Sequence, residues 1–234
     1  MTNWVSFYDF KHSVIYVNER HRDVHYRKIA QDIAAYVPSP AARMLDYGSG
    51  EATSADLIAA ACGHLTLVEA APHVRASLAQ RYAANPKVAV VTPEQVEAMP
   101  EASFDLIVMH SVAQYLTAHQ LDEILALFRR LLKPDGLVVL GDVVPPHLAA
   151  PYAALALLRF GAQNGFLGAA VLGLIRIFFS DYMRLRKTAG LSHYEEGEIL
   201  TRLKVAGFMA ARAEENIGHN QRRMTFVARP VTPG

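Results

Sequence analysis

The sequence predicts an α/β protein whose sheet is doubly wound and mostly parallel. Short apolar runs alternate with segments of helical periodicity, a glycine-rich turn follows the first run, and a glutamate ends the second. Two parallel strands need a long crossover between them, usually a helix, so this alternation is typical of parallel sheets. The sequence contains no internal repeats and no low-complexity linker, which favours one compact unit.

The first half of the chain supplies three short strands and three helices. A helical pattern stops before Pro38, and Pro72 stands where a first helical residue is expected. The apolar runs between the helical patterns have the length of short buried strands. The sequence thus predicts strands at 43–47, 64–69 and 87–91, and helices at 22–37, 55–62 and 72–82.

The second half continues the same alternation up to a long apolar stretch. The run FDLIVM at 104–109 resembles a strand that is buried on both faces. A helical pattern at 119–132 is followed by KPDG, which predicts a turn before a strand at 137–142. Beyond the apolar stretch we expect a helix at 195–205, stopped by Gly207, and two final strands at 208–214 and 223–229.

Composition and charge exclude several classes of protein. The 234 residues include 23 Lys+Arg and 22 Asp+Glu, which give a formal net charge of +1. This balance lacks the basic footprint of a dedicated nucleic-acid binder. The single cysteine, Cys62, excludes an intrachain disulfide and fits a reducing compartment. The polar N-terminus shows no apolar run typical of a secretory signal, so we expect a cytoplasmic protein.

One stretch, 145–179, accounts for the low charged fraction of 19%. Arg159 and Arg176 interrupt its apolar runs, and neither run reaches the ~18–20 residues of a membrane-spanning helix. We expect two helices, near 149–160 and 166–179, that are apolar around most of their circumference. The apolar surface of such helices must be buried. It can be buried against the core, a hydrophobic ligand, a second copy of the chain or a membrane surface. A basic cluster that would suit anionic lipids follows at Arg184, Arg186 and Lys187.

A glycine turn after the first strand indicates a ligand site. Gly48 and Gly50 allow the backbone to turn tightly and to approach a ligand closely. The third glycine of the dinucleotide fingerprint would fall on Thr53, and Glu51 would repel a diphosphate, so a ligand without phosphates is favoured. Glu69 ends the second strand, where a carboxylate can accept hydrogen bonds from ribose hydroxyls.

Four segments in order, LDYGSGEAT, LVEAAP, SFDLIVMHSVAQYL and LLKPDGLVVLGD, resemble the motifs of class I S-adenosylmethionine-dependent methyltransferases, in the small-molecule and lipid branch. The resemblance implies a seven-stranded Rossmann-like sheet with an antiparallel final strand and a helical insertion after strand five. It divides the chain into an N-terminal helical cap at 1–40, a cofactor-binding core at 41–145, an apolar insertion at 146–190 and a C-terminal part at 191–234 that completes the core.

The resemblance also implies the residues that bind S-adenosylmethionine and its product S-adenosylhomocysteine (SAH). Asp46 would support the methionine amino group, and Glu69 would bind the ribose hydroxyls. Gln95 stands where the family usually has an aspartate that accepts from the adenine amino group, and an amide oxygen accepts without charge assistance. The implied set is Tyr16, Asp46, Gly48, Ser49, Gly50, Glu69, Ala70, Gln95, Val96, His110 and Ser111.

No motif fixes a catalytic base, although a protonated acceptor such as an alcohol would require one. His110, at the end of the fourth strand, is the best-placed residue, with packing or cofactor contact as the alternative. His193 and His219 lie near element ends that reach the same sheet edge, and we expect structural or exposed roles for them.

The N-terminal stretch contains Tyr16, Arg20 and His25, which could contact the methionine carboxylate or the acceptor. The alternative reading, that His21, His25 and the arginines form a solvated helix face, is the stronger one. His21 and His25 have the spacing of half a metal pair, but the sequence lacks HExxH or a carboxylate cluster, so we expect no metal site.

The sequence therefore predicts a methyltransferase that acts on a small, hydrophobic acceptor at O, N or C. The apolar stretch 148–179 would form a lid over the acceptor, a homodimer interface or a peripheral membrane contact. Two alternatives stay open: a lipid or phospholipid methyltransferase at a membrane surface, and a cofactor-binding module without turnover. A nucleic-acid substrate is disfavoured by the charge balance.

Overall fold

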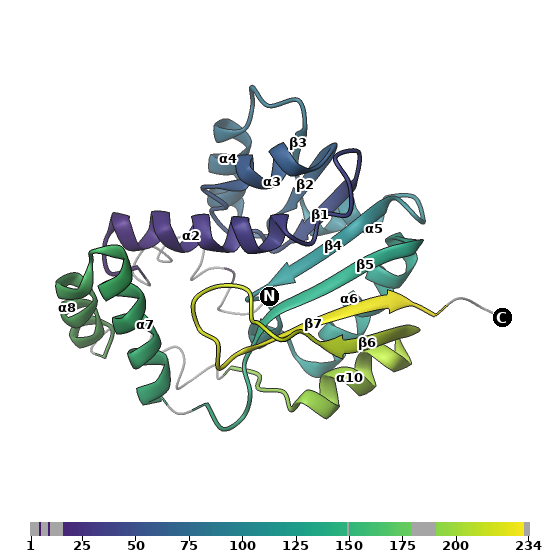
Figure 1. Ribbon diagram of the computed structural model, residues 1–234. Helices are drawn as coiled ribbons and strands as arrows, with labels where there is room; N and C mark the ends of the chain where they lie inside the picture. Colours follow the sequence, from purple (N-terminus) through teal and green to yellow (C-terminus); the bar gives the residue numbers. More distant parts are fainter. Residues whose placement is uncertain (1–4, 6–8, 10–15, 149, 179–190, 232–234) are drawn as a thin grey trace.

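A computed structural model describes residues 5, 9, 16–148, 150–178 and 191–231. Its centre is a seven-stranded sheet with the strand order β3-β2-β1-β4-β5-β7-β6 (Figure 1). The first five strands are parallel to one another, and β7 runs antiparallel to both β5 and β6. The strands are β1 (Arg43–Tyr47), β2 (His64–Val68), β3 (Val88–Val91), β4 (Phe104–His110), β5 (Leu132–Val143), β6 (Phe208–Arg212) and β7 (Met224–Pro230). The predicted doubly wound sheet with an antiparallel final strand is confirmed.

Helices cover both faces of this sheet, because successive strand residues point to opposite sides. Met44 packs in a cluster with Ile33 and Ile58, whereas Leu45 packs in a separate cluster with Leu125 and Phe128. Both clusters are almost fully buried and together form the core. The covering helices are α2 (Glu19–Ala34), α3 (Ala55–Ala61), α4 (Pro72–Arg81), α5 (Pro93–Glu97), α6 (Ala118–Leu131) and α10 (Glu196–Val205).

The order of the strands reverses between β1 and β4, since β2 and β3 lie on one side of β1 and the later strands on the other. At such a switch point the loops that leave the carboxyl ends of the two strands diverge and open a crevice. The glycine turn follows β1, and His110 ends β4, so both lie at this crevice.

Three local features differ from the sequence prediction. The KPDG segment is part of β5 and not a separate turn: pairing with β4 jumps from Phe104↔Leu132 to Leu106↔Leu137, so these residues form an excursion inside the strand. Helix α5 was not predicted, because only Val96 of its five residues is buried and a capping box stabilises it. Helix α2 begins at Glu19, three residues early, because the Asn18 side chain accepts from the His21 backbone N–H.

The apolar insertion folds as a helical hairpin of α7 (Ala150–Asn164) and α8 (Leu167–Phe178), as predicted. Gly165 makes the turn with a φ of +74°. Figure 1 shows the hairpin beside the N-terminal end of α2, away from the sheet. It has its own small apolar cluster of Phe160, Phe166 and Ala170, against which Val17 and Val24 pack. Within the described residues, neither of these helices nor any other is long and apolar enough to cross a membrane.

Candidate cofactor and acceptor site

The glycine turn after β1 has a backbone that only glycine adopts easily. Gly48 and Gly50 have φ angles of +79° and +60°, in the left-handed region. A Cβ added to Gly48 would lie 2.4 Å from Cγ2 of Val112, so the turn packs directly against the segment after β4. The backbone N–H groups of Gly48 and Ser49 donate to the Val68 carbonyl, at 2.9 and 3.0 Å, and tie the turn to β2.

Glu69 lies against this turn, at the end of β2. Its Oε2 accepts from the Gly50 N–H at 2.9 Å, and its Oε1 accepts from the Ala71 N–H at 2.8 Å. Burial raises the pKa of this carboxyl above its ordinary value, against the effect of these backbone donors. The neighbouring Ala70 is exposed. The carboxylate is thus fixed beside the turn where the resemblance implies a ribose.

Asp46 is a buried carboxyl that faces a cavity. The cavity is also lined by Tyr26, Gly48, Ser49 and His110. Burial, assisted by the charge of Glu69, raises the pKa of Asp46 to about 7. No side chain or backbone group among the described residues donates a hydrogen bond to it, which is costly for a buried polar group unless a ligand supplies the donor. A ligand ammonium group at this position would satisfy the carboxylate.

Tyr26, on α2, closes the cavity from the side opposite the sheet. Its hydroxyl accepts from the Glu51 N–H at 3.2 Å and from the Tyr16 hydroxyl. Burial raises the pKa of Tyr26 to about 12 and also raises the pKa of Tyr16 well above its usual value. Tyr16 therefore reaches the glycine turn through Tyr26, which the sequence analysis missed because nothing local links residues 26 and 51.

Gln95 and Val96 are placed by helix α5. The Gln95 Oε1 accepts from the Thr92 N–H at 2.8 Å, so the predicted acceptor for the adenine amino group is engaged in the capping box. Its side chain is exposed, whereas Val96 is fully buried in the core. Their roles toward adenine stay a prediction.

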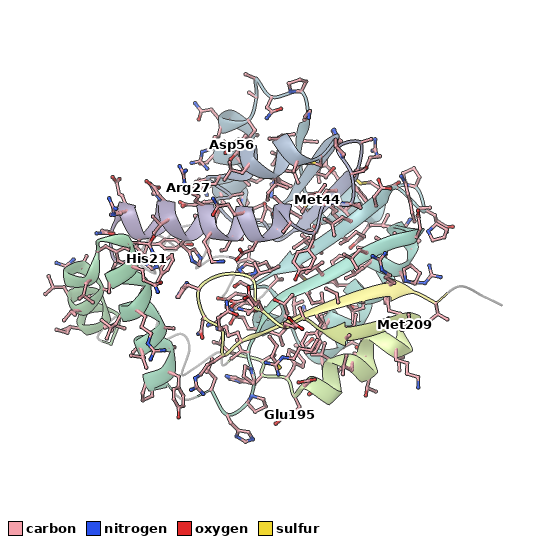
Figure 2. The ribbon with its side chains drawn as sticks, viewed as in Figure 1. His21, Arg27, Met44, Asp56, Glu195 and Met209 are labelled. Atoms are coloured by element: carbon pink, nitrogen blue, oxygen red, sulfur yellow. The ribbon has the colours of Figure 1, made fainter. Side chains whose placement is uncertain are left out.

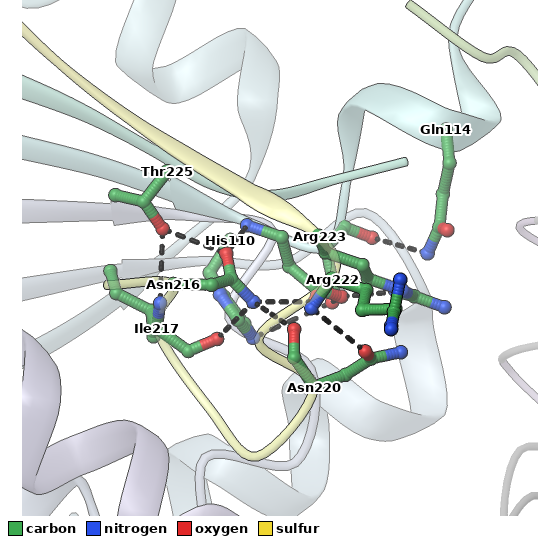
Figure 3. A network of polar contacts seen from close by, with 10 residues as sticks. His110, Gln114, Asn216, Ile217, Asn220, Arg222, Arg223 and Thr225 are labelled. Carbon is green, nitrogen blue, oxygen red and sulfur yellow. Dashed lines mark hydrogen bonds and ion pairs between the residues drawn. The ribbon is translucent and has the colours of Figure 1, made fainter. Parts of the chain in front are cut away.

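His110 and Ser111 belong to a polar network at the ends of β4 and β5 (Figure 3). The Ser111 hydroxyl donates to Asp142, and Nε2 of His110 lies 3.4 Å from that hydroxyl oxygen. Arg223 and Asn216 also bind the Asp142 carboxylate. Burial opposes the charge on Asp142, but Arg223, His110 and these hydrogen bonds hold its pKa below the usual value. No local signal in the sequence indicates this network, because Asp142 and Arg223, which pair in it, are 81 residues apart.

Three further histidines gather between α2, the hairpin and the loop that joins β6 to β7. The ring centroids of His21 and His25 lie 5.9 Å apart, and those of His25 and His219 lie 5.6 Å apart. Phe166 stacks on His21 at 5.0 Å, and Phe160 stacks on His219 at 4.6 Å. We call His21, His25 and His219 with these two phenylalanines the imidazole cluster; Figure 2 shows His21 where α2 meets the hairpin.

The cluster corrects the expectation of a solvated histidine face. His21 is only 5% exposed, and burial lowers the pKa of His21 and of His219 to about 4. No group of three metal-ligating side chains with suitable geometry occurs in the described part of the chain. His193 is exposed. Arg20 contacts the hairpin instead of the cofactor cavity, since its Nε donates to the Asn164 carbonyl at 2.5 Å.

Comparisons with known proteins agree with this arrangement. Residues 45–140 match the family model described as a methyltransferase domain. A search of curated proteins found no match. Among solved structures, the complex of DhpI with SAH is 12% identical, with a TM-score of 0.62 over 98% of this chain and 96% of that one.

Two further solved structures share the fold at similar distance. Magnesium protoporphyrin IX methyltransferase (ChlM) from Synechocystis PCC 6803 with bound SAH is 14% identical, with a TM-score of 0.58 over 92% of this chain and 89% of that one. The mitomycin 7-O-methyltransferase MmcR is 16% identical, with a TM-score of 0.62 over 97% of this chain and 61% of that one. Residues 45–140 are therefore similar to a methyltransferase domain, and the chain shares the fold of these solved methyltransferase structures.

Proposed function

We propose that this protein transfers a methyl group from S-adenosylmethionine to a small, hydrophobic acceptor. The observation that carries the proposal is the buried Asp46 carboxyl, which faces the cavity without a donor from the described residues. Glu69 lies beside it and accepts from the Gly50 N–H of the glycine turn, so a second carboxylate borders the site. The set fits a cofactor with an ammonium group and a ribose but no phosphate.

The residues act by positioning. Asp46 would hold the ammonium group of the methionine part, and Glu69 would accept from the two ribose hydroxyls. When bound, the cofactor supplies a methyl group on a sulfonium centre that leaves as a neutral thioether. Orientation of this centre against an acceptor can lower the barrier by ~7–11 kcal/mol in well-aligned cases. Tyr26 and three apolar residues of α2 (Ile29, Ala30 and Ile33) line the cavity.

The hairpin of α7 and α8 supports a hydrophobic acceptor. Phe160 and Phe166 reach from it onto His219 and His21, beside the crevice at which His110 ends β4. The two phenylalanines are buried and make this side of the crevice apolar. We propose that the hairpin acts as the cover of the acceptor site.

A second candidate function is methylation of a lipid at a membrane surface. The outer face of the hairpin favours it, because Leu167, Val171, Leu172 and Ile175 are 45–58% exposed on α8. The same face would suit a homodimer of a cytoplasmic enzyme. Both assignments, and the location in the cytoplasm, are proposals.

Calorimetry with S-adenosylmethionine and with SAH tests the proposed function. We expect both to bind the intact protein, and Asp46→Asn and Glu69→Gln each to weaken binding by about tenfold or more, as for loss of a hydrogen bond to a charged group. Glu123→Gln, at an exposed side chain of α6, is the matched control and leaves affinity unchanged. If neither S-adenosylmethionine nor SAH binds the intact protein, the proposal is wrong and the protein does not use this cofactor.

A further inference from the structure

We propose that the outer face of the hairpin docks on an anionic membrane surface, with its apolar side chains among the lipids and its arginines at the lipid phosphates. The outer face consists of exposed side chains of α8, namely Leu167, Val171, Leu172, Ile175 and Arg176. Figure 1 shows the hairpin at the edge of the molecule, where a flat surface can approach it. This docking goes beyond the proposed methyl transfer, since it needs neither the cofactor nor the acceptor.

Helix α8 packs inward through small residues and presents large apolar ones to solvent, the reverse of an ordinary surface helix. On the inner side, Ala170 is fully buried, and a Cβ added to Gly173 would clash with Val17. On the outer side, Leu172 and Ile175 are 58% and 56% exposed. The fold therefore gains little from these large side chains, which indicates that something outside the chain covers them.

The exposed side chains of α8 share one face of the helix. Leu167, Val171 and Ile175 follow one another at every fourth position, and Leu172 and Arg176 form the neighbouring row. Residues four apart lie on the same side of a helix, so the two rows adjoin. The helix has 12 residues, and no helix among the described residues is long and apolar enough to cross a membrane. Helix α8 would therefore lie parallel to the membrane surface.

Helix α7 carries a similar exposed row. Tyr152, Leu155 and Arg159 succeed one another at helical spacing, and all three are exposed. The guanidinium of Arg222, from the loop between β6 and β7, lies 4.0 Å from the centroid of the Tyr152 ring. A tyrosine with cationic neighbours is typical of the boundary between lipid and water. Both helices of the hairpin thus expose residue types that suit this boundary.

The charges of the hairpin select the kind of lipid. Residues 143–180 contain no aspartate or glutamate, although the whole chain has 22. The charged residues of α7 and α8 are Arg159 and Arg176, and both are exposed. Each basic residue near an anionic leaflet strengthens binding by about fivefold. The outer face therefore complements a surface of anionic phospholipids.

The same charges disfavour a second copy of the chain as the partner. In a two-fold dimer the face would meet itself, so that arginine would approach arginine. Residues 143–180 offer no carboxylate that could pair with these arginines across such a contact. An apolar contact that brings like charges together is destabilised. A lipid surface avoids this cost, because its phosphates supply the opposite charge.

Flotation of the intact protein with vesicles tests the docking. We expect binding to vesicles of equal parts phosphatidylglycerol and phosphatidylcholine, and binding weaker by about tenfold or more to phosphatidylcholine alone or at high ionic strength. Equal binding to the two kinds of vesicle, or binding to neither, overturns the inference. A stable dimer in sedimentation equilibrium, with no binding to vesicles, overturns it in favour of a second copy.

A pair of double variants tests the apolar side chains. Leu172→Ser with Ile175→Ser should weaken binding to the phosphatidylglycerol vesicles by about tenfold or more, because two inserted side chains are lost. Val205→Ser with Met209→Ser is the matched control, since these side chains are 83% and 72% exposed at α10 and β6. Thermal unfolding confirms that both variants are folded. Equal binding by the two double variants contradicts the inference.

A second pair tests the arginines. Arg159→Gln with Arg176→Gln should weaken binding to the phosphatidylglycerol vesicles by about tenfold or more and leave binding to phosphatidylcholine alone unchanged. Arg27→Gln with Lys204→Gln is the matched control, because it removes the same charge from exposed positions of α2 and α10. SAH affinity is measured in each variant, so that a failure of the proposed function is seen separately. A loss no greater than in the control overturns the anionic surface as the partner.

Discussion

The glycine-turn site and the imidazole cluster are built in different ways. In the glycine-turn site, Asp46, Gly48, Gly50 and Glu69 lie on or directly after two adjacent strands, and backbone hydrogen bonds tie the turn to the second strand. The imidazole cluster is assembled from α2, the hairpin and the loop between β6 and β7. The glycine-turn site is therefore part of the sheet, whereas the imidazole cluster forms where three separate segments pack together. Because of this difference, we expect the glycine-turn site and the imidazole cluster to respond differently to substitution, pH and ligands.

The largest contrast is expected between two buried phenylalanines. Phe128 lies in the core beneath the sheet, and Phe160 lies in the small cluster of the hairpin. Phe128→Ala should lower the free energy of unfolding by about 3–5 kcal/mol, because it leaves a cavity in a packed core. Phe160→Ala should mainly increase local hydrogen exchange in α7 and α8. Denaturant unfolding measures the first effect and native-state hydrogen exchange the second. An equal loss of unfolding free energy in the two variants would show that the hairpin unfolds together with the core.

The glycine turn offers the next test. Gly48→Ala combines a φ of +79° with a Cβ contact of 2.4 Å, so we expect a loss of about 1–3 kcal/mol in stability and a clear loss of SAH affinity. Gly168→Ala on α8 is the control, since nothing lies within 4 Å of its added Cβ. Thermal unfolding and calorimetry report the two quantities. Normal SAH affinity in Gly48→Ala would show that the turn tolerates a side chain.

The imidazole cluster should make stability depend on pH. The folded chain holds the pKa of His21 and of His219 at about 4, against the usual 6.5. Between pH 6.5 and 4 the unfolded chain binds more protons, so each histidine removes up to about 1.4 kcal/mol of stability per pH unit as the pH falls. Asp46, with its pKa raised to about 7, acts in the opposite direction over the same range.

A comparison of variants separates these contributions. Denaturant unfolding from pH 7 to 5 should show a smaller loss of stability in His21→Gln and His219→Gln than in the intact protein. Exposed His119→Gln should keep the slope of the intact protein. Identical slopes in all four proteins would mean that the cluster is open to solvent.

The smallest effect on stability is expected on the outer face of the hairpin. Leu172 and Ile175 are 58% and 56% exposed, so Leu172→Ser with Ile175→Ser should change the unfolding free energy by about 0.5 kcal/mol or less. The pair should instead abolish any self-association or vesicle binding of the intact protein. Sedimentation equilibrium and flotation with vesicles of phosphatidylglycerol and phosphatidylcholine distinguish these two. A large loss of unfolding free energy in this double variant would show that the two side chains pack against the rest of the chain.

The same division explains what could be predicted from the sequence. The strands and the glycine turn were visible because their signals are local: apolar runs, glycines and an acidic residue nineteen positions after Gly50. The sequence analysis missed Tyr26, Asp142 and Arg223. Each of them binds a partner at least 25 residues away in the sequence, and no local pattern indicates such a contact. The helical period of the histidines in α2 was recognised, but burial by the hairpin reversed their interpretation from exposed to buried.

Helix α2 contacts both the glycine turn and the hairpin. Toward its middle, Tyr26 holds the backbone of Glu51 in the glycine turn, and at its start Arg20 holds the last residue of α7. The helix is continuous over its 16 residues. A ligand that displaced Tyr26 and a ligand that displaced the hairpin would therefore act on the same helix. If their binding is coupled through it, each changes the affinity of the other by the same factor.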